Sequence, residues 1–344
     1  PYAARYVNMF LGLFLCLLIG LFSLRLHGTT GGLISLCLAV TSPSIIAHSS
    51  ITTLDTGLAL FLVGCFYFLY ESHCRGKRWF SLVAALFLGL AASAKYTIIL
   101  LFPYVILLIV AAHWLYDRKW TQIVTELLLG AFIVWFIISA LFLFKGCFAI
   151  KGSGEDGFLL KMAKWLSPTG LIQSLQNKFS QAATSVVPHS FLGKLQPVDI
   201  RFYVGVLLFK VLPGTLLMVI PFIYYSNFQQ RLSWQGWLYT VLPAALFWLF
   251  FNFNNTYCGI RHLLPILGFI FIAFGKLGKD CIQSQKGRNY LLFLLALNLF
   301  ASLHSFPYHM AYFNILGQKL SSSPFVIGTS DSDYGQEDNA LKRA

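Results

Sequence analysis

Apolar residues run along this chain in ten long stretches, which shorter polar segments separate. A helix that crosses a bilayer needs about 20 mostly apolar residues, because each residue adds only about 1.5 Å to its length. The pattern therefore predicts an all-α integral membrane protein, a polytopic bundle of about ten transmembrane helices. The predicted spans are 7–24, 31–48, 56–71, 80–94, 97–113, 122–144, 203–225, 236–253, 262–277 and 289–305.

Two less apolar segments divide this series of spans into modules. Residues 1–145 would form an N-terminal transmembrane module of six helices, and residues 203–305 a C-terminal set of four. Between them, the loop 146–202 mixes Leu, Phe and Trp with lysines over 158–183. That mixture is typical of an amphipathic helix in the membrane interface, and a solvated loop with some structure fits it equally well. Residues 306–344 are interpreted as an exoplasmic tail that begins a soluble domain.

The composition agrees with a membrane protein. Of 344 residues, 57% are hydrophobic and 11% are charged, against about 25% charged in a typical soluble domain. The seven cysteines are scattered singly, without the spacing of metal ligands, so neither a zinc site nor a disulfide framework is indicated. The spacing leaves open whether Cys147 pairs with Cys258.

Lysine and arginine residues lie mainly in every second loop between the predicted spans. One set of loops holds eleven of them, and the opposite short connections hold three, which are Arg5, Lys95 and Arg261. Because cytoplasmic loops carry the excess of Lys and Arg, the first set is predicted to be cytoplasmic and the two long segments exoplasmic. The sequon Asn254-Asn255-Thr256 falls on that exoplasmic side. The net charge of +13 thus follows the membrane topology, and no nucleic-acid partner is expected.

One carboxylate stands at the exoplasmic mouth of the third span. Asp55 is the only acidic residue in the first 70 residues of the chain. A carboxylate in this place could hold a sugar hydroxyl, bind a metal ion or pair with a cation. The alternative is a helix N-cap, because an Asp at a helix start accepts hydrogen bonds from backbone N–H groups.

Four cations are predicted on or near the same face, and they are Arg5, Lys95, Lys210 and Arg261. Lys210 lies inside the seventh span, where an ionisable group costs roughly 2.5–3.5 kcal/mol, so it should face a partner or a polar cavity. Guanidinium and ammonium groups at one membrane surface suit a phosphate. For Lys95 and Lys210 the alternative is a side chain that extends to the interface.

Six stretches in order along the chain carry a resemblance to a known family. They are Ser42-Pro43-Ser44-Ile45-Ile46-Ala47-His48 through Thr53-Leu54-Asp55, Gly89-Leu90-Ala91 to Lys95-Tyr96, Phe202-Tyr203 to Lys210-Val211-Leu212-Pro213, Gly259-Ile260-Arg261-His262-Leu263-Leu264-Pro265, Tyr312-Phe313-Asn314, and Ser330-Asp331-Ser332-Asp333-Tyr334-Gly335-Gln336. The sequence resembles the polyprenol-phosphate-sugar-dependent glycosyltransferases of the GT-C fold, in the branch related to dolichyl-phosphate-mannose–protein mannosyltransferases. His262 stands where this family usually has Tyr, and Tyr334 where it usually has Trp.

The resemblance implies an inverting transfer of a sugar from a polyprenyl- or dolichyl-phosphate donor to an acceptor hydroxyl on a protein or glycolipid. Arg261 and Lys210 would stabilise the charge that grows on the departing phosphate, with Arg5 and Lys95 as further candidates. His262, Tyr96 and Asp333 are the other motif residues that this implies. For Asp333 a turn held by Asp side chains is the alternative.

The general base that the family uses is an acidic residue of its first exoplasmic loop, which would lie before Pro1. The chain is therefore expected to lack an N-terminal stretch. Asp55 matches the family's second acidic position, so it would orient the sugar or help to bind a metal. The sequence requires no cofactor, and a divalent metal stays compatible with it.

Two other functions compete with a transferase. A transporter or flippase would also bury ions in a helical bundle, but its paired inverted repeats are not seen in this sequence. A non-catalytic accessory subunit would explain the missing acid. The sugar, the acceptor and the organism stay open, so the membrane is either the bacterial inner membrane or that of the ER, with the site facing the periplasm or the lumen.

Overall fold

The computed structural model describes residues 2–145, 201–225, 232–253 and 259–320, together with short stretches between 147 and 196. The chain divides into two compact units. Unit 1 comprises Pro1–Val63 and Val186–Ala344, and unit 2 comprises Gly64–Ser185. Both are built from helices, as the apolar pattern predicts.

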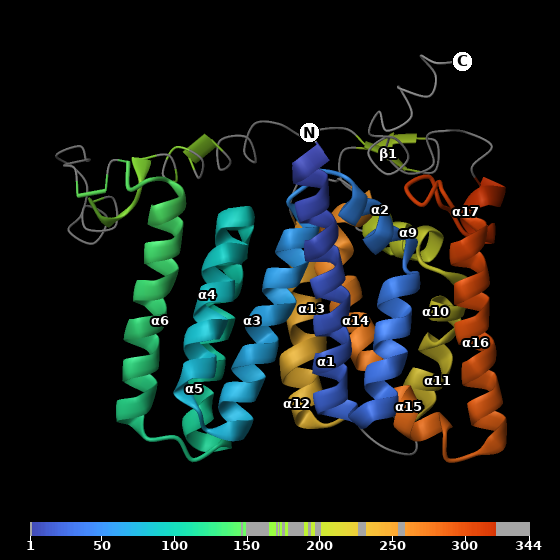
Figure 1. Ribbon diagram of the computed structural model, residues 1–344, viewed down its shortest axis with the longest axis horizontal. Helices are drawn as coiled ribbons and strands as arrows, with labels where there is room; N and C mark the ends of the chain where they lie inside the picture. The colour runs from blue at the N-terminus through green and yellow to red at the C-terminus, as the bar shows by residue number, and fades with distance from the viewer. Residues whose placement is uncertain are drawn as a thin grey trace. The chain divides into compact units, whose positions relative to one another are not determined.

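Unit 1 begins with a helical hairpin. Helix α1 (Tyr2–Thr41) contains Gly28 with φ 81°, a left-handed conformation that glycine adopts without a steric penalty. The chain reverses direction at Gly28. As a result, Gly20 before the turn packs against Gly32 and Leu36 after it. The predicted spans 7–24 and 31–48 are the two arms of this hairpin, and the second arm continues into α2 (Pro43–Ser50) (Figure 1).

Serine hydroxyls and a glycine join the α1 hairpin to α14 (Leu264–Phe274). Ser35 donates a hydrogen bond of 2.7 Å to Ser23 Oγ and is also 2.6 Å from the Phe271 carbonyl oxygen. A Cβ on Gly275 would lie 1.9 Å from Ser23 Oγ, so only glycine permits this approach. Small residues at helix contacts are typical of membrane bundles, where close packing replaces the hydrophobic effect as the driving force.

The remaining elements of unit 1 are helices of different lengths and one hairpin. In the described residues, β1 (His189–Phe191) pairs antiparallel with β2 (Lys194–Gln196), a small departure from the all-α prediction. The helices are α3 (Asp55–Arg75, shared with unit 2), α9 (Arg201–Lys210), α10 (Pro213–Leu217), α11 (Val219–Tyr224), α12 (Trp234–Gly236), η3 (Trp237–Val241), α13 (Leu242–Phe253), η4 (Gly259–Leu263), α14, α15 (Lys276–Cys281), α16 (Gln285–His304) and α17 (Ile315–Leu320).

The predicted span 203–225 is a broken helix. Residues Arg201–Lys210 and Pro213–Tyr224 meet at an angle of 118°, because Pro213 has no N–H to continue the helical ladder. The side chain of Asn314 satisfies carbonyls that the break leaves open. Its amide nitrogen lies 2.6 Å from Leu208 O and 2.9 Å from Val211 O.

Unit 2 packs α4 (Arg78–Ala94) against α6 (Trp120–Leu141). The turn η1 (Tyr96–Leu101) leads into α5 (Phe102–Leu115), which also contacts α6. Glycines allow the helices to approach closely, since a Cβ on Gly89 would meet Ile137 at 3.0 Å. The helices of this unit therefore interlock by the same small-residue packing as those of unit 1.

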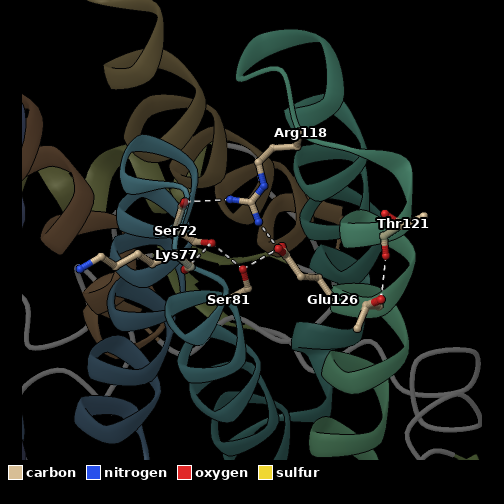
Figure 2. Close-up of polar contacts among 7 residues, drawn as sticks. Ser72, Lys77, Ser81, Arg118, Thr121 and Glu126 are labelled. Carbon is tan, nitrogen blue, oxygen red and sulfur yellow. Dashed lines mark hydrogen bonds and ion pairs between the residues drawn. The ribbon is translucent and has the colours of Figure 1, made fainter.

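A buried polar cluster closes one end of unit 2, and Figure 2 shows its contacts. Arg118 and Glu126 form an ion pair, and the two residues are 6% and 4% exposed. Ser81 donates to Glu126 at 2.8 Å, and the Arg118 guanidinium donates to the Ser72 carbonyl oxygen at 3.2 Å. Arg118, counted from the sequence as a loop cation, is thus a buried group held by an acid inside the predicted span 122–144.

The helices confirm an integral membrane protein. In the described parts of the chain, four helices are long and apolar enough to cross a membrane, and the bent pair at α9–α11 would make a fifth. The four are Asp55–Arg75, Trp120–Leu141, Gly259–Cys281 and Tyr2–Thr41, of which the last contains both arms of the hairpin at Gly28. The predicted number of about ten is not confirmed. The predicted interfacial helix at 158–183 and the sequon at 254–256 lie largely or wholly outside the described residues.

Candidate functional site

Several elements that carry sequence motifs meet at one end of unit 1. Helix α2 contacts η4, η4 contacts α9, and α9 contacts α17. Figure 1 shows α2, α9 and α17 at the end of this unit where the chain begins, away from α12 and α15. The motifs around His48, Lys210, Arg261 and Asn314, which are far apart in the sequence, are therefore brought to the same end of the unit.

The η4 turn presents one arginine. Of its five residues, all of them described, Gly259, Ile260, His262 and Leu263 are buried, and Arg261 is partly exposed. Gly259 has φ 68°, which a residue with a side chain rarely adopts. The chain thus enters η4 through a conformation suited to glycine, and Arg261 is the one residue of the turn that is not fully buried, although its Nε atom is enclosed.

An aromatic cluster packs behind η4. The Tyr203 hydroxyl and His262 Nδ1 share a hydrogen bond of 3.1 Å, and the imidazole stacks on Phe251 with ring centroids 4.6 Å apart. Tyr203, Phe251 and His262 are 0%, 2% and 8% exposed. His262, the residue that departs from the family pattern, is therefore a hydrogen-bonded member of the core beside Arg261.

Lys210 is buried and contacts the segment that follows α16. Its ammonium donates to the carbonyl oxygen of Met310 at 3.0 Å and lies 3.9 Å from the ring centroid of Phe313. The side chain is 2% exposed, so it does not extend to the interface. The expectation that Lys210 faces a partner is confirmed, and the motif Tyr312-Phe313-Asn314 supplies that partner together with Met310.

Asp55 and Arg5 occupy different environments at this end of unit 1. Asp55 begins α3 and is 4% exposed, and a carboxylate in the first turn is favoured by the helix dipole. Arg5 is exposed near the start of α1. One turn further on, Asn8 donates to the His48 carbonyl oxygen at 2.7 Å and so joins α1 to α2. His48 itself is fully buried, and the sequence marks it only as part of a motif.

Three other predicted site residues are not placed beside Arg261 and Lys210, because they lie in unit 2 or outside the described residues. Lys95 belongs to unit 2, where it caps the C-terminus of α4 through a 3.0 Å hydrogen bond from its backbone N–H to Ala91 O and is partly exposed. Tyr96 begins η1. Asp333 lies outside the described residues, as does Tyr334. No group of three His, Cys, Asp or Glu side chains that could hold a metal occurs in the part of the chain that was described.

The segment that follows α16 holds titratable groups near Lys210. His309 shares a 2.8 Å hydrogen bond with Ser305 Oγ, and burial lowers the pKa of the imidazole. Burial also raises the pKa of Tyr312 to about 12. At neutral pH both side chains are uncharged, so Lys210 meets a carbonyl and an aromatic ring in an otherwise neutral segment.

Comparison with known proteins gives a family match and two similar solved structures. Residues 2–142 match the family described as dolichyl-phosphate-mannose-protein mannosyltransferase. Among solved structures, a similar one is ArnT from Cupriavidus metallidurans bound to undecaprenyl phosphate, with 12% identity and a TM-score of 0.50. The match covers 94% of this chain and 59% of ArnT, so the chain spans less than two thirds of that protein.

A second structure is the oligosaccharyltransferase of Archaeoglobus fulgidus, tethered with an acceptor peptide containing the NVT sequon. Its identity is 12% and its TM-score 0.45, over 99% of this chain and 45% of that one. A search of curated protein sequences gives no significant match. The match over 2–142 and the shared fold with ArnT agree with the resemblance that the motifs carry. Residues 2–142 are therefore similar to the dolichyl-phosphate-mannose-protein mannosyltransferase family, and the chain shares its helical fold with ArnT.

Proposed function

We propose that the protein to which this chain belongs transfers a sugar from a polyprenyl-phosphate donor to an acceptor hydroxyl at the exoplasmic face of the membrane. The observation that carries this proposal is the meeting of α2, α9, η4 and α17 at one end of unit 1, with the partly exposed Arg261 on η4. The family match of residues 2–142 and the fold shared with ArnT, whose structure holds undecaprenyl phosphate, support it.

Arg261 is the proposed ligand of the donor phosphate. The acceptor oxygen attacks the anomeric carbon, the bond from that carbon to the phosphate oxygen breaks, and the electron pair stays on the phosphate. A fixed guanidinium stabilises this growing charge more than it stabilises the bound donor, which is the requirement for catalysis. Lys210 and the exposed Arg5 are proposed to add positive potential at the same end, and Lys95 stays a candidate from unit 2.

The acceptor proton must pass to a base. We give Asp55 the role of orienting the sugar and not that of this base. Asp55 is buried at the N-terminus of α3, a place that fixes the direction of a carboxylate. The acceptor would be a protein or glycolipid hydroxyl, and the face periplasmic or luminal.

The hydrocarbon chain of the donor needs an apolar surface beside the phosphate site. An apolar groove of about 460 Å³ lies in unit 1 between α9–α11 and α13–α14. Leu208 and Val211, which lie on either side of Lys210 in the sequence, line it. Its volume is within the range of about 300–1,000 Å³ of ligand sites. We propose that the first isoprenoid units of the donor lie in this groove.

Sugar transfer by the full-length protein in membranes tests the proposal. We expect Arg261→Ala to lower transfer by about 10²–10³-fold, the effect of removing one donor from a charge-stabilising site. Asp55→Asn should also lower it. The matched control is Lys279→Ala, because Lys279 is an exposed cation on α15, at the other end of unit 1. Equal transfer by Arg261→Ala and the control would remove Arg261 from the mechanism.

A further inference from the structure

We propose that Tyr203, through its hydrogen bond to His262, fixes the η4 turn so that Arg261 is held toward the donor phosphate. Tyr203 and His262 are then positioning residues, and they do not themselves touch the reacting atoms. The inference rests on the proposed function and deepens it, because it names what determines the direction of the phosphate-binding arginine.

The hydrogen bond is a directional contact between the buried side chains of η4 and α9. Tyr203 and His262 are separated by 59 residues in the sequence and by 3.1 Å at Tyr203 Oη and His262 Nδ1. Ile260 and Leu263 are also buried, but apolar contacts have no preferred direction. A buried hydrogen bond has one, and breaking it leaves two buried polar atoms without their contact. The bond therefore opposes a rotation of the turn more specifically than the apolar packing does.

Phe251 packs against the imidazole ring of His262. The ring of His262 stacks on Phe251 at 4.6 Å with an interplanar angle of 27°, and Phe251 in turn lies 6.1 Å from the ring of Tyr203. The imidazole thus has its plane set by Phe251 and its rotation within that plane set by the Tyr203 hydroxyl. A His side chain supplies both contacts, which a purely apolar ring in its place would not.

Fixing His262 also fixes Arg261, because the two residues are consecutive in the η4 turn. Successive residues of a 3₁₀ helix point about 120° apart, so with Ile260 and His262 anchored in the core, Arg261 takes the remaining, partly exposed direction. A small rotation of the turn would move the guanidinium, and a displacement of about 1 Å in a positioning group can lower a rate about 100-fold. The Tyr203 hydroxyl is thereby coupled to phosphate binding without contact with the phosphate.

A double-mutant cycle on the full-length protein tests the coupling. The probe is the affinity for polyprenyl phosphate, measured in detergent for Tyr203→Phe, Arg261→Ala and the pair. We expect Tyr203→Phe to weaken binding about five- to tenfold, the effect of one buried hydrogen bond, and to have almost no effect once Arg261 is Ala. Tyr239→Phe is the matched control, since Tyr239 in η3 is also 0% exposed and lies outside the site.

A merely structural role would lower the affinity by the same factor in both backgrounds, and that result would overturn the inference. So would Tyr203→Phe binding polyprenyl phosphate as tightly as the wild type. Sugar transfer by the wild type, recorded in parallel, reports on the proposed function itself. If the wild type transfers sugar but Tyr203→Phe lowers the lipid-phosphate affinity equally with and without Arg261→Ala, only the positioning role is excluded. If the wild type neither transfers sugar nor binds polyprenyl phosphate, the positioning role and the proposed function are both excluded.

Discussion

The ammonium of Lys210 lies 3.0 Å from the carbonyl oxygen of Met310, a residue 100 positions further along the chain. This bond joins the last residue of α9 to the segment that follows α16. Asn314 strengthens this connection from the same segment. Its amide nitrogen donates to the carbonyl oxygen of Leu208 in α9 and to that of Val211 just after it. Its amide oxygen accepts from two N–H groups at the start of α17. The broken span and the C-terminal segment are thus fastened to each other at the end of unit 1 that carries Arg261.

Replacing the ammonium tests this joint. Lys210→Met keeps the volume of the side chain but leaves the Met310 carbonyl without its donor, which should lower the free energy of unfolding by about 1–3 kcal/mol. The measurement is the midpoint of thermal unfolding in detergent. Met310→Leu is the control, since the bond uses the backbone oxygen and a Met-to-Leu exchange costs less than about 1.5 kcal/mol. An unchanged midpoint for Lys210→Met would contradict the role of the bond.

The ion pair in unit 2 gives a second prediction. Arg118→Met or Glu126→Leu alone leaves a buried charge without its partner and should destabilise the protein by about 3–5 kcal/mol. The double variant removes both charges and should recover most of that loss. Thermal unfolding of the four proteins measures the coupling. Additive losses in the double variant would show that the two side chains do not stabilise each other as Figure 2 indicates.

His309 predicts a dependence of stability on pH. Burial lowers the pKa of its imidazole, so the folded state favours the neutral ring. The contribution of this group is therefore fully present above the unfolded pKa of about 6.5 and is lost as the pH falls below it. We expect the unfolding midpoint of the wild type to drop more between pH 7.5 and pH 5 than that of His309→Gln. Identical pH curves for the two proteins would exclude His309 as a contributor.

The helical membrane fold could be predicted from the sequence, because runs of apolar residues report on local structure alone. The partner of Lys210 could not be named, since Met310 and Phe313 are distant in sequence and no periodicity connects them. The bond between Tyr203 and His262 is of the same kind. That Glu126 has a polar partner could be predicted from the sequence. It is the only acidic residue within the predicted span 122–144, and an acid in a membrane span rarely lacks a function or a partner.

The number of spans was harder to predict for a physical reason. A proline can break an apolar stretch without changing its hydropathy, so Pro213 turns the predicted span 203–225 into two helices at 118°. The loop position of Arg118 likewise predicts a solvent-exposed cation, because it does not reveal that the side chain contacts a buried acid. The site residues Asp55, Arg261 and Arg5 stay predictions that activity measurements must test.

The most direct test of the transferase account is the balance of products made by the purified full-length protein. A transferase must release one polyprenyl phosphate for each sugar that appears on the acceptor. We predict equal amounts of the two products for the wild type and a loss of both together for Arg261→Ala. Movement of the sugar lipid across vesicle membranes without release of polyprenyl phosphate would contradict the account and favour a transporter.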